Sequence, residues 1–239
     1  MTGQGGGPFQ GIQAITLDLD DTLWPVLPVL AQAERELVEW LPPPAPLTAQ
    51  TLAAGRSVLA LKSQYPEHAH DMSWLRRRLL HDLLTELHED PALADPAFAV
   101  FLEARQRVTP WPEVEGILAA WASRYRIAAI TNGNADVHRT PLGPYFSASI
   151  SAPAFGAAKP DPRIFHAACD ALGVEPGATL HIGDDLELDV LAARRAGLHA
   201  AWLLRPELGR PSVVNNTERR GALQPYFFSL LSIDNAVQR

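Results

Sequence analysis

Carboxylates follow an apolar run near the start of the chain. In AITLDLDDTLW, residues 14–24, the apolar run reaches Leu17 and then meets Asp18, Asp20 and Asp21 almost at once. Packing gives no reason for a buried strand to end in this way, because an unpaired buried charge is costly. Grouped carboxylates can bind a hard cation or act as nucleophile, acid and base, so this segment predicts a chemical site.

Other polar groups stand in the same relation to later apolar runs. Thr131 and Asn132 end the run YRIAAIT, and Asp184 and Asp185 follow the run TLHIG. Lys159 lies in FGAAKPDPRIF, on a loop just before a predicted helix. A lysine acts as a point charge for phosphate or for developing negative charge. Together with a free carboxylate and a cation, these groups form an apparatus for nucleophilic phosphoryl transfer.

Strand-length apolar runs alternate with helical patterns around these residues. The runs cover residues 12–18, 125–131, 179–183 and 199–204. Between them one helix begins at Asp161 and Pro162 and ends at Gly173, with N-cap, first-turn proline and closing glycine in their usual places. The alternation predicts parallel βαβ units, and the near-continuous apolar strands predict a sheet covered on both faces. Because open parallel sheets bind ligands beyond the carboxyl ends of their strands, we expect the polar groups to meet at one rim.

The segment from about 28 to 108 has no convincing strand and shows helical faces instead. The faces are Leu30, Ala33, Leu37 and Leu41, then Leu75, Leu79, Leu80, Leu83, Leu84 and Leu87, then Phe98, Leu102 and Arg105. In the second of these helices Arg76, Arg77 and Arg78 are consecutive, so they point around the helix and cannot form one patch. Either these arginines are solvated or one of them contacts substrate.

The predicted fold is therefore α/β, with a doubly wound, mainly parallel, Rossmann-like sheet core and an inserted α-helical cap. The core takes residues 9–27 and 109–239, the cap takes 28–108, and residues 1–8 form a flexible glycine-rich tail. After about residue 206 the chain is loop-rich, and only a short strand and helix are predicted, around PYFFSLLSIDNAV.

Composition narrows the class of protein. A formal net charge of −7 disfavours a nucleic-acid partner, because a phosphate polymer would be repelled. Cys169 is the one cysteine, which suits a reducing cytoplasm. No signal peptide or membrane span is predicted. We expect a cytoplasmic monomer or homodimer that acts on a small molecule.

Four motifs occur in order along most of the chain. They are DLDDT at 18–22, TNGN at 131–134, Lys159 within AAKPDPRIF, and GDDLELD at 183–189. With these motifs the chain resembles the haloacid dehalogenase (HAD) superfamily, whose first motif is DxDxT. The helical insert directly after the first motif looks like the type 1 cap of that superfamily, a mobile roof over the sheet edge.

The resemblance implies a role for each site residue. Asp18 is expected to be the nucleophile that becomes an aspartyl phosphate, and Asp20 the general acid and later the base that activates water. Thr131, Asn132 and Lys159 are expected to hold the phosphoryl oxygens. Asp18, the backbone carbonyl of Asp20, and Asp184 are expected to hold Mg²⁺. Thr22, Asp185 and Asp189 are expected to support these groups.

Asp20 also separates activities within the superfamily. Members resembling the dehalogenases lack a carboxylate at this position, because their leaving halide needs no proton. An alkoxide leaving group does need one, so the carboxylate of Asp20 favours a Mg²⁺-dependent phosphatase of a small phosphorylated metabolite. LDLDDTLW, AITNGNA, LHIGDDLELDV and AAWLLRPE resemble bacterial phosphatases of the flavin pathway, which act on a ribitylaminouracil phosphate or FMN. A sugar or nucleotide phosphate is a further possibility. The alternatives are a phosphomutase with the same motifs and a catalytically idle ligand-binding module.

Overall fold

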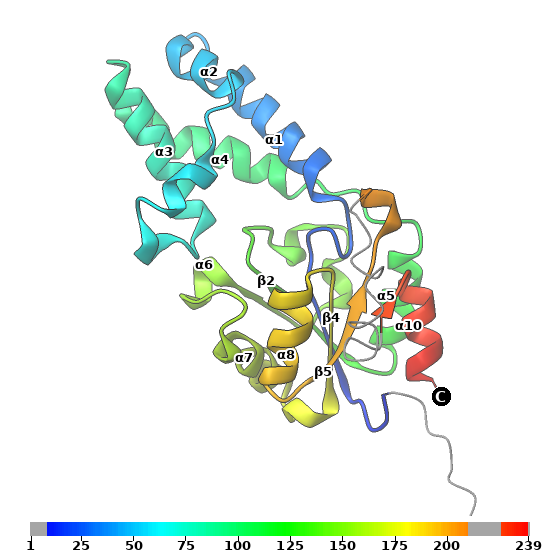
Figure 1. Cartoon of the computed structure of the whole chain (residues 1–239). Coiled ribbons are helices and arrows are strands. Elements are labelled where there is room, and N and C mark those ends of the chain that lie inside the picture. The colour runs from blue at the N-terminus through cyan, green and yellow to red at the C-terminus, as the bar shows by residue number, and fades with distance from the viewer. Residues whose placement is uncertain (1–8, 210–225, 239) are drawn as a thin grey trace, which may run out of the picture.

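The computed structural model describes residues 9–209 and 226–238 and places a six-stranded sheet at the centre of the protein (Figure 1). The strands lie in the order β3-β2-β1-β4-β5-β6, and every pairing among them is parallel. Their bounds are β1 Ala14–Leu17, β2 Arg126–Thr131, β3 Ala148–Ser151, β4 Thr179–Gly183, β5 His199–Leu203 and β6 Tyr226–Phe227.

Helices cover both faces of this sheet. Ile15 and Leu17 of β1 belong to the apolar cluster that includes α5 and α10, whereas Ala14 belongs to the cluster that includes α7 and α8. Successive strand residues point to opposite faces, which explains the alternation. The helix bounds are α5 Val114–Ala122, α6 Ala152–Phe155, α7 Pro162–Leu172, α8 Ala192–Arg195 and α10 Leu230–Val237, with a π-helical segment at Leu186–Leu191. The predicted doubly wound, Rossmann-like fold is confirmed.

The order of the strands creates a switch point at β1. From β1 the chain builds outward on one side through β2 and β3, and on the other through β4 and β5. Asp18 follows the last residue of β1, and Asp184 follows the last residue of β4. Both carboxylates therefore stand at the carboxyl edge of the sheet, beside the crevice where such sheets bind ligands.

A group of helices above this edge forms the cap (Figure 1). Its helices are α1 Val26–Trp40, α2 Pro46–Ala53, α3 Met72–Glu86 and α4 Ala94–Arg105, joined in part by 3₁₀ turns at Val58–Lys62, Pro66–His68 and Pro91–Leu93. Their buried leucine, alanine and phenylalanine side chains form an apolar cluster of their own, separate from the two clusters of the sheet. Helix α1 begins two residues before the predicted boundary at 28, and α4 ends three before the boundary at 108. The division into core and cap at those residues stays a prediction.

Strand β3 was not predicted from the sequence. Its residues, ASIS, hold one large apolar side chain, Ile150, and all four are only partly buried, because the strand lies at the edge of the sheet. The short strand and helix predicted around PYFFSLLSIDNAV are present as β6 and α10. The predictions for residues 1–8, and those for 210–225, lie outside the described residues. Among the helices of the described part of the chain, none is both long and apolar enough to cross a membrane.

Candidate active site

A tight turn directly after β1 directs the first carboxylates. Asp21 has a φ of 60°, a left-handed conformation that Asp tolerates better than most residues. Its backbone N–H donates to the carbonyl of Trp24 over 2.7 Å, and its Oδ1 accepts the N–H of Val26 over 2.8 Å. The turn lets α1 and the cap begin only a few residues after the sheet ends.

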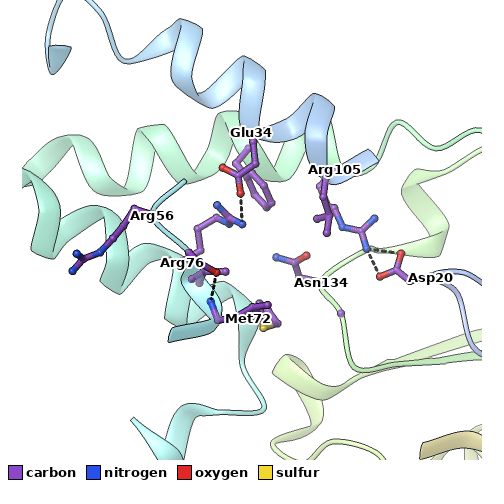
Figure 2. A pocket seen from close by; sticks show the side chains of 13 residues that line it. Asp20, Glu34, Arg56, Met72, Arg76, Arg105 and Asn134 are labelled. Atoms are coloured by element: carbon purple, nitrogen blue, oxygen red, sulfur yellow. Dashed lines mark hydrogen bonds and ion pairs between the residues drawn. The ribbon is translucent and has the colours of Figure 1, made fainter. Parts of the chain in front are cut away.

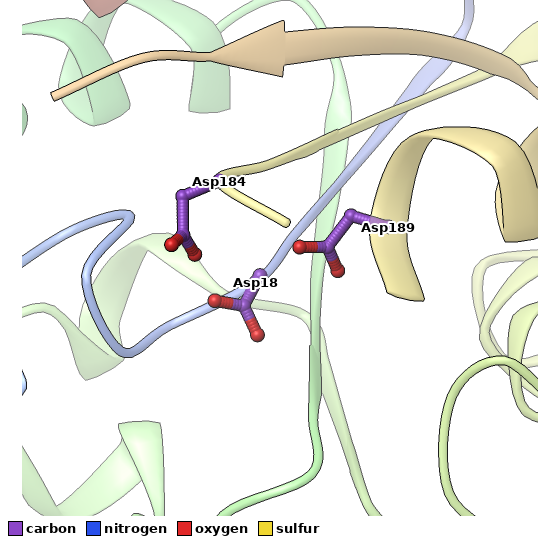
Figure 3. A group of neighbouring side chains, drawn as sticks. All are labelled: Asp18, Asp184 and Asp189. Atoms are coloured by element: carbon purple, nitrogen blue, oxygen red, sulfur yellow. The ribbon is translucent and has the colours of Figure 1, made fainter. Parts of the chain in front are cut away.

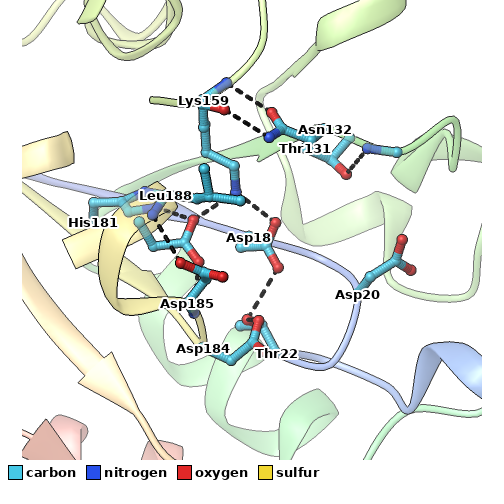
Figure 4. Close-up of polar contacts among 12 residues, drawn as sticks. Asp18, Asp20, Thr22, Thr131, Asn132, Lys159, His181, Asp184, Asp185 and Leu188 are labelled. Atoms are coloured by element: carbon cyan, nitrogen blue, oxygen red, sulfur yellow. Dashed lines mark hydrogen bonds and ion pairs between the residues drawn. The ribbon is translucent and has the colours of Figure 1, made fainter. Parts of the chain in front are cut away.

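Asp18 is held from two sides at the rim of the sheet (Figure 4). Lys159 Nζ donates to its Oδ1 over 2.6 Å. Thr22 Oγ1 lies 3.2 Å from its Oδ2 and 3.3 Å from Asp184 Oδ1, so the one hydroxyl proton can serve either carboxylate. Asp18 is therefore fixed in orientation, which suits a nucleophile.

Asn132 and Asp189 position Lys159. The side-chain amide of Asn132 donates to the Lys159 carbonyl over 2.9 Å, and its Oδ1 accepts the Lys159 N–H over 2.7 Å. Lys159 Nζ also donates to Asp189 Oδ1 over 2.6 Å. Burial opposes the charge of Lys159, but the carboxylates of Asp18 and Asp189 outweigh it and raise the pKa of Lys159 above its ordinary value. A buried, permanently charged ammonium group thus faces Asp18.

A buried histidine and a glycine complete the setting of Asp189. His181 Nε2 lies 3.2 Å from Asp189 Oδ1, and its Nδ1 lies 2.9 Å from Thr16 Oγ1. A Cβ on Gly183 would lie 2.2 Å from Asp189 Cγ, so Asp189 needs the missing side chain at this position. Neither His181 nor Gly183 was predicted from the sequence as a site residue. A polar residue inside the apolar strand TLHIG was the signal that could have revealed His181.

Three carboxylates form a cluster that fits a divalent cation (Figure 3). Oxygen atoms of Asp18, Asp184 and Asp189 all lie within 4.8 Å of one another. Asp189 is the least suited as a ligand, because its oxygens already accept from Lys159, His181 and the N–H of Asp185. Burial, reinforced by Asp189 and Asp184 and opposed by Lys159, raises the pKa of Asp18 well above its ordinary value. A bound cation would remove this penalty, so the donor set fits a metal held by Asp18 and Asp184.

Asp20 lies apart from this cluster and turns towards the cap (Figure 2). Arg105 Nη2, from the end of α4, donates to its Oδ1 over 2.7 Å and to its Oδ2 over 2.5 Å, and Trp24 Nε1 donates to Oδ1 over 2.9 Å. The carboxylate of Asp20 is therefore not part of the acidic cluster, and only its backbone carbonyl stays a candidate metal ligand.

Asp20 stands between two hollows. One, of about 200 Å³, is lined by Asp18, Asn132, Lys159 and Asp184, among others. The other, of about 270 Å³, lies between core and cap. Asp20 lines both. A phosphate in the first hollow and its leaving group in the second would place the bridging oxygen beside this carboxylate, which is the position a general acid needs.

The remaining predicted residues lie close by. Thr131 is buried, and its Oγ1 accepts the N–H of Gly133 over 3.0 Å. Asp185 is exposed at the edge of the first hollow, and its Oδ1 accepts the N–H groups of Glu187 and Leu188, so it caps the π-helical segment. The side-chain amide of Asn132 is used by Lys159, as described above. The catalytic and binding roles of these residues stay predictions.

Comparison with known proteins agrees with this arrangement. The family model described as haloacid dehalogenase-like hydrolase matches residues 12–197. The chain belongs to this family. Its resemblance to the HAD superfamily is thereby confirmed, and the match covers β1, the cap and the sheet as far as the helix that follows β4.

Two curated HAD relatives cover most of both chains, and both are phosphatases. The 5-amino-6-(5-phospho-D-ribitylamino)uracil phosphatase YigB of Escherichia coli (strain K12) is 34% identical over 208 residues, which is 84% of this chain and 87% of that protein. The phosphoserine phosphatase of Thermus thermophilus is 32% identical over 227 residues, 82% of this chain and 91% of that one. The predicted assignment to the HAD phosphatases, hydrolases of phosphoric monoesters, is confirmed.

A solved HAD structure carries a different name. The 2-haloacid dehalogenase from Pseudomonas syringae pv. Tomato DC3000 is 32% identical, with a TM-score of 0.79, and covers 95% of this chain and 99% of that chain. Its name disagrees with those of the two phosphatases. In this chain the carboxylate of Asp20 lies between the two hollows, and its role as a proton donor to an ester oxygen stays a prediction.

Proposed function

We propose that the protein is a Mg²⁺-dependent phosphatase that hydrolyses a small phosphorylated metabolite through an aspartyl phosphate on Asp18. One observation carries the proposal: Asp18, held by Lys159 and Thr22, faces a hollow that meets the cap cavity at Asp20. A nucleophile, a fixed positive charge and a carboxylate at the ester oxygen are the groups that phosphoryl transfer needs.

In the first step an oxygen of Asp18 attacks phosphorus, and the bond to the leaving oxygen breaks. Asp20 in its protonated form donates its proton to that oxygen, so the leaving group departs as an alcohol. In the second step Asp20, now ionised, takes a proton from water, which attacks phosphorus and frees Asp18 and phosphate. Lys159 lies beside Asp18 throughout and stabilises the charge on the phosphoryl oxygens.

Asp18, Asp184 and the backbone carbonyl of Asp20 would hold the Mg²⁺. The ion would neutralise the carboxylates and the phosphoryl oxygens, which otherwise repel the attacking Asp18. Thr22 orients Asp18 and Asp184 from behind by the contacts given above. Thr131 and Asn132, at the end of β2, would complete the phosphate site.

The test compares the wild-type protein with Asp18→Asn, using p-nitrophenyl phosphate. The chelated wild-type protein should be inactive and recover on addition of Mg²⁺, whereas Asp18→Asn should stay inactive at any Mg²⁺ concentration. Asp170→Asn is the matched control, because Asp170 is exposed on α7, away from the site. Activity retained by Asp18→Asn would remove Asp18 from its role.

The relatives support two substrates. YigB acts on a ribitylaminouracil phosphate by its name, which favours a riboflavin precursor or FMN, and the Thermus relative favours phosphoserine. Sugar and nucleotide phosphates complete the panel. A kcat/KM ranking of these compounds decides between them.

Product analysis distinguishes the proposed phosphatase from two other enzyme activities. A phosphomutase would yield an isomerised sugar phosphate in place of free phosphate. A dehalogenase, the activity named for the Pseudomonas structure, would release halide from a 2-haloacid. An idle module would bind ligand without turnover.

We propose a cytoplasmic monomer or homodimer with no nucleic-acid or membrane partner. The net charge of −7 and the single cysteine support it. Size-exclusion chromatography with light scattering tests the oligomeric state.

A further inference from the structure

Two side chains at the carboxyl end of β5 reach the turns that follow two other strands. Strand β4 lies between β5 and β1 in the sheet. Trp202, in β5, and Arg205, two residues after β5 ends, have no role in the proposed reaction steps. Each of them donates to a backbone carbonyl in a turn that carries residues of the acidic cluster or their support. These contacts bear on where the reacting groups lie.

Trp202 holds the turn after β4. Its backbone pairs with Gly183, the last residue of β4, and the ladder between the two strands ends there. Its indole Nε1 donates to the carbonyl of Asp184, the next residue, over 2.9 Å. Trp202 is 4% exposed, so water has little access to this contact. The indole thus holds the chain one residue beyond the ladder, at the residue expected to bind the metal.

Arg205 holds the turn after β1. Its Nη2 and Nε donate to the carbonyl of Thr22 over 2.7 Å and 3.3 Å. Its Nη1 pairs with Glu113, and its guanidinium carbon lies 5.2 Å from the centre of the Trp111 ring. The side chain is 2% exposed. Because the donors of a guanidinium have a fixed, planar arrangement, these further contacts of Arg205 leave the Thr22 carbonyl little freedom to move.

The two held turns meet at the acidic cluster. Thr22 Oγ1 lies 3.2 Å from Asp18 Oδ2 and 3.3 Å from Asp184 Oδ1. One side chain from the end of β5 therefore holds the backbone at Asp184, and a second holds the backbone at Thr22. The separation of the Asp18 and Asp184 carboxylates depends on how these two turns lie relative to each other. Both turns are tied to the same strand.

A fixed separation of carboxylates matters more to Mg²⁺ than to a larger cation. Mg²⁺ demands nearly octahedral ligands at about 2.0–2.1 Å, whereas Ca²⁺ accepts flexible arrangements at about 2.3–2.6 Å. Carboxylates held at one distance can therefore favour the smaller ion, and carboxylates that are free to spread lose that preference. Residues that support metal ligands from behind typically change metal affinity by about 10–100-fold when they are replaced.

We infer that Trp202 and Arg205 are positioning residues of the metal site, which together set the distance between Asp18 and Asp184 and thereby favour Mg²⁺ over a larger cation. The inference rests on the proposed function, since that function places Mg²⁺ on these two carboxylates. The effect is on affinity and selectivity for the cation, which are measured without substrate and without turnover.

Competition against Mn²⁺, followed by electron paramagnetic resonance, tests the inference, because Mn²⁺ accepts the same oxygen ligands. Mg²⁺ or Ca²⁺ is added to the chelated protein loaded with Mn²⁺, and the released Mn²⁺ gives each affinity. Trp202→Phe, which loses the indole N–H, and Arg205→Met, which loses the guanidinium, should each bind Mg²⁺ about tenfold or more weakly than the wild-type protein. Ca²⁺ affinity should fall less. Arg205→Lys keeps the charge and a donor for Thr22, so it should recover part of the loss.

Two matched controls separate positioning from loss of packing. Trp121→Phe removes a buried indole whose Nε1 donates to Asp234 Oδ1 over 2.8 Å, between α5 and α10. Arg126→Met removes an arginine whose Nη1 donates to the backbone carbonyl of Leu172, at the amino end of β2. Both variants should keep the Mg²⁺ affinity of the wild-type protein and its ratio of Mg²⁺ to Ca²⁺ affinity.

The results distinguish the two proposals. Wild-type Mg²⁺ affinity in Trp202→Phe, or an equal loss of Mg²⁺ and Ca²⁺ affinity, would overturn the inference and leave the proposed function standing. Selective loss of Mg²⁺ in Trp202→Phe, with no hydrolysis of any phosphate ester by the wild-type protein, would contradict the proposed function alone. A wild-type protein that binds neither Mg²⁺ nor Mn²⁺ would overturn both. If Arg205→Met does not fold, Trp202→Phe, which leaves no charge unpaired, decides the outcome.

Discussion

Arg105 and Asp20 form an ion pair that joins the last turn of cap helix α4 to the turn after β1. The Arg105 side chain is 1% exposed, and its Nη2 lies within 2.7 Å of both oxygens of Asp20. Its Nε and Nη1 are buried without a hydrogen-bond partner in the described structure. A buried charge with so few partners is costly, so the Asp20 contact is what makes this position of Arg105 tolerable. The cap is thereby tied to the expected general acid.

Loss of Arg105 should therefore impair Asp20. We predict that Arg105→Met lowers kcat for alkyl phosphates by about tenfold or more, since misplacement of a catalytic group by an ångström can cost about 10²-fold. Turnover of p-nitrophenyl phosphate should fall less. Steady-state kinetics on both substrates measure the difference. Arg107→Met is the control, because Arg107 pairs with Glu36 at the surface. Equal losses on the two substrates in Arg105→Met would contradict the link to Asp20.

Substitution of Asp20 itself should depend on the leaving group. Asp20→Asn removes the proton donor, and general acid catalysis contributes about 10²–10⁴-fold. We predict a loss in that range for alkyl phosphates and a much smaller loss in the rate of phosphoenzyme formation from p-nitrophenyl phosphate, whose leaving group needs no proton. Rapid-quench measurement of phosphoenzyme formation checks this. The same loss with both esters would exclude Asp20 as the acid.

Gly183 should be sensitive to the smallest substitution. In Gly183→Ala the new Cβ would lie 2.2 Å from Asp189 Cγ, so Asp189 must move and release Lys159. We predict a loss of about 1–3 kcal/mol in unfolding free energy, together with reduced turnover. Denaturant unfolding and kinetics measure the two effects. Gly177→Ala, with no heavy atom within 4 Å of its Cβ, is the control. Wild-type stability in Gly183→Ala would show that Asp189 is not fixed as described.

His181 should make stability depend on pH. Burial, opposed by Asp189, lowers the pKa of His181 in the folded protein. The unfolded chain keeps the ordinary pKa of about 6.5 and binds the proton first, so stability falls as pH drops below that value, by up to about 1.4 kcal/mol per pH unit. We predict that His181→Asn flattens the fall in unfolding free energy between pH 7 and pH 5.5, approximate limits set by that pKa. The exposed His81, replaced by Asn, should leave the slope as in the wild-type protein. An unchanged slope in His181→Asn would contradict the prediction.

The sheet and the motif residues were predictable because they depend on local pattern and on one rule of topology. Asp18 and Asp184 follow apolar strands, and parallel strands end at one edge, so their meeting followed from sequence order. Lys159 was placed by the capped helix that begins at Asp161, and the structure shows that cap as Asp161 Oδ1 accepting the N–H of Arg163. Strand β3 could not be predicted, because it lacks an apolar run.

The contacts between cap and core were not predictable in the same way. Arg105 was assigned to an apolar helix face, and only the fold shows that its guanidinium group reaches Asp20. The structure likewise buries Trp24 and places its Nε1 on Asp20, a contact that no local pattern in the sequence indicates. Arg76 was one of three consecutive arginines, and helical geometry could say that they diverge but not which one turns inward. Such contacts depend on how the cap helices pack against one another and against the core, and no local pattern in the sequence encodes that packing.

The covalent intermediate is the central claim, and reductive trapping tests it most directly. Borohydride added during turnover of p-nitrophenyl phosphate with Mg²⁺ would convert an aspartyl phosphate to homoserine, and mass spectrometry of the digested protein would locate the change. We predict homoserine at position 18 in the wild-type protein, and no such product without substrate. Steady turnover with an unmodified Asp18, or with homoserine at another position, would contradict it.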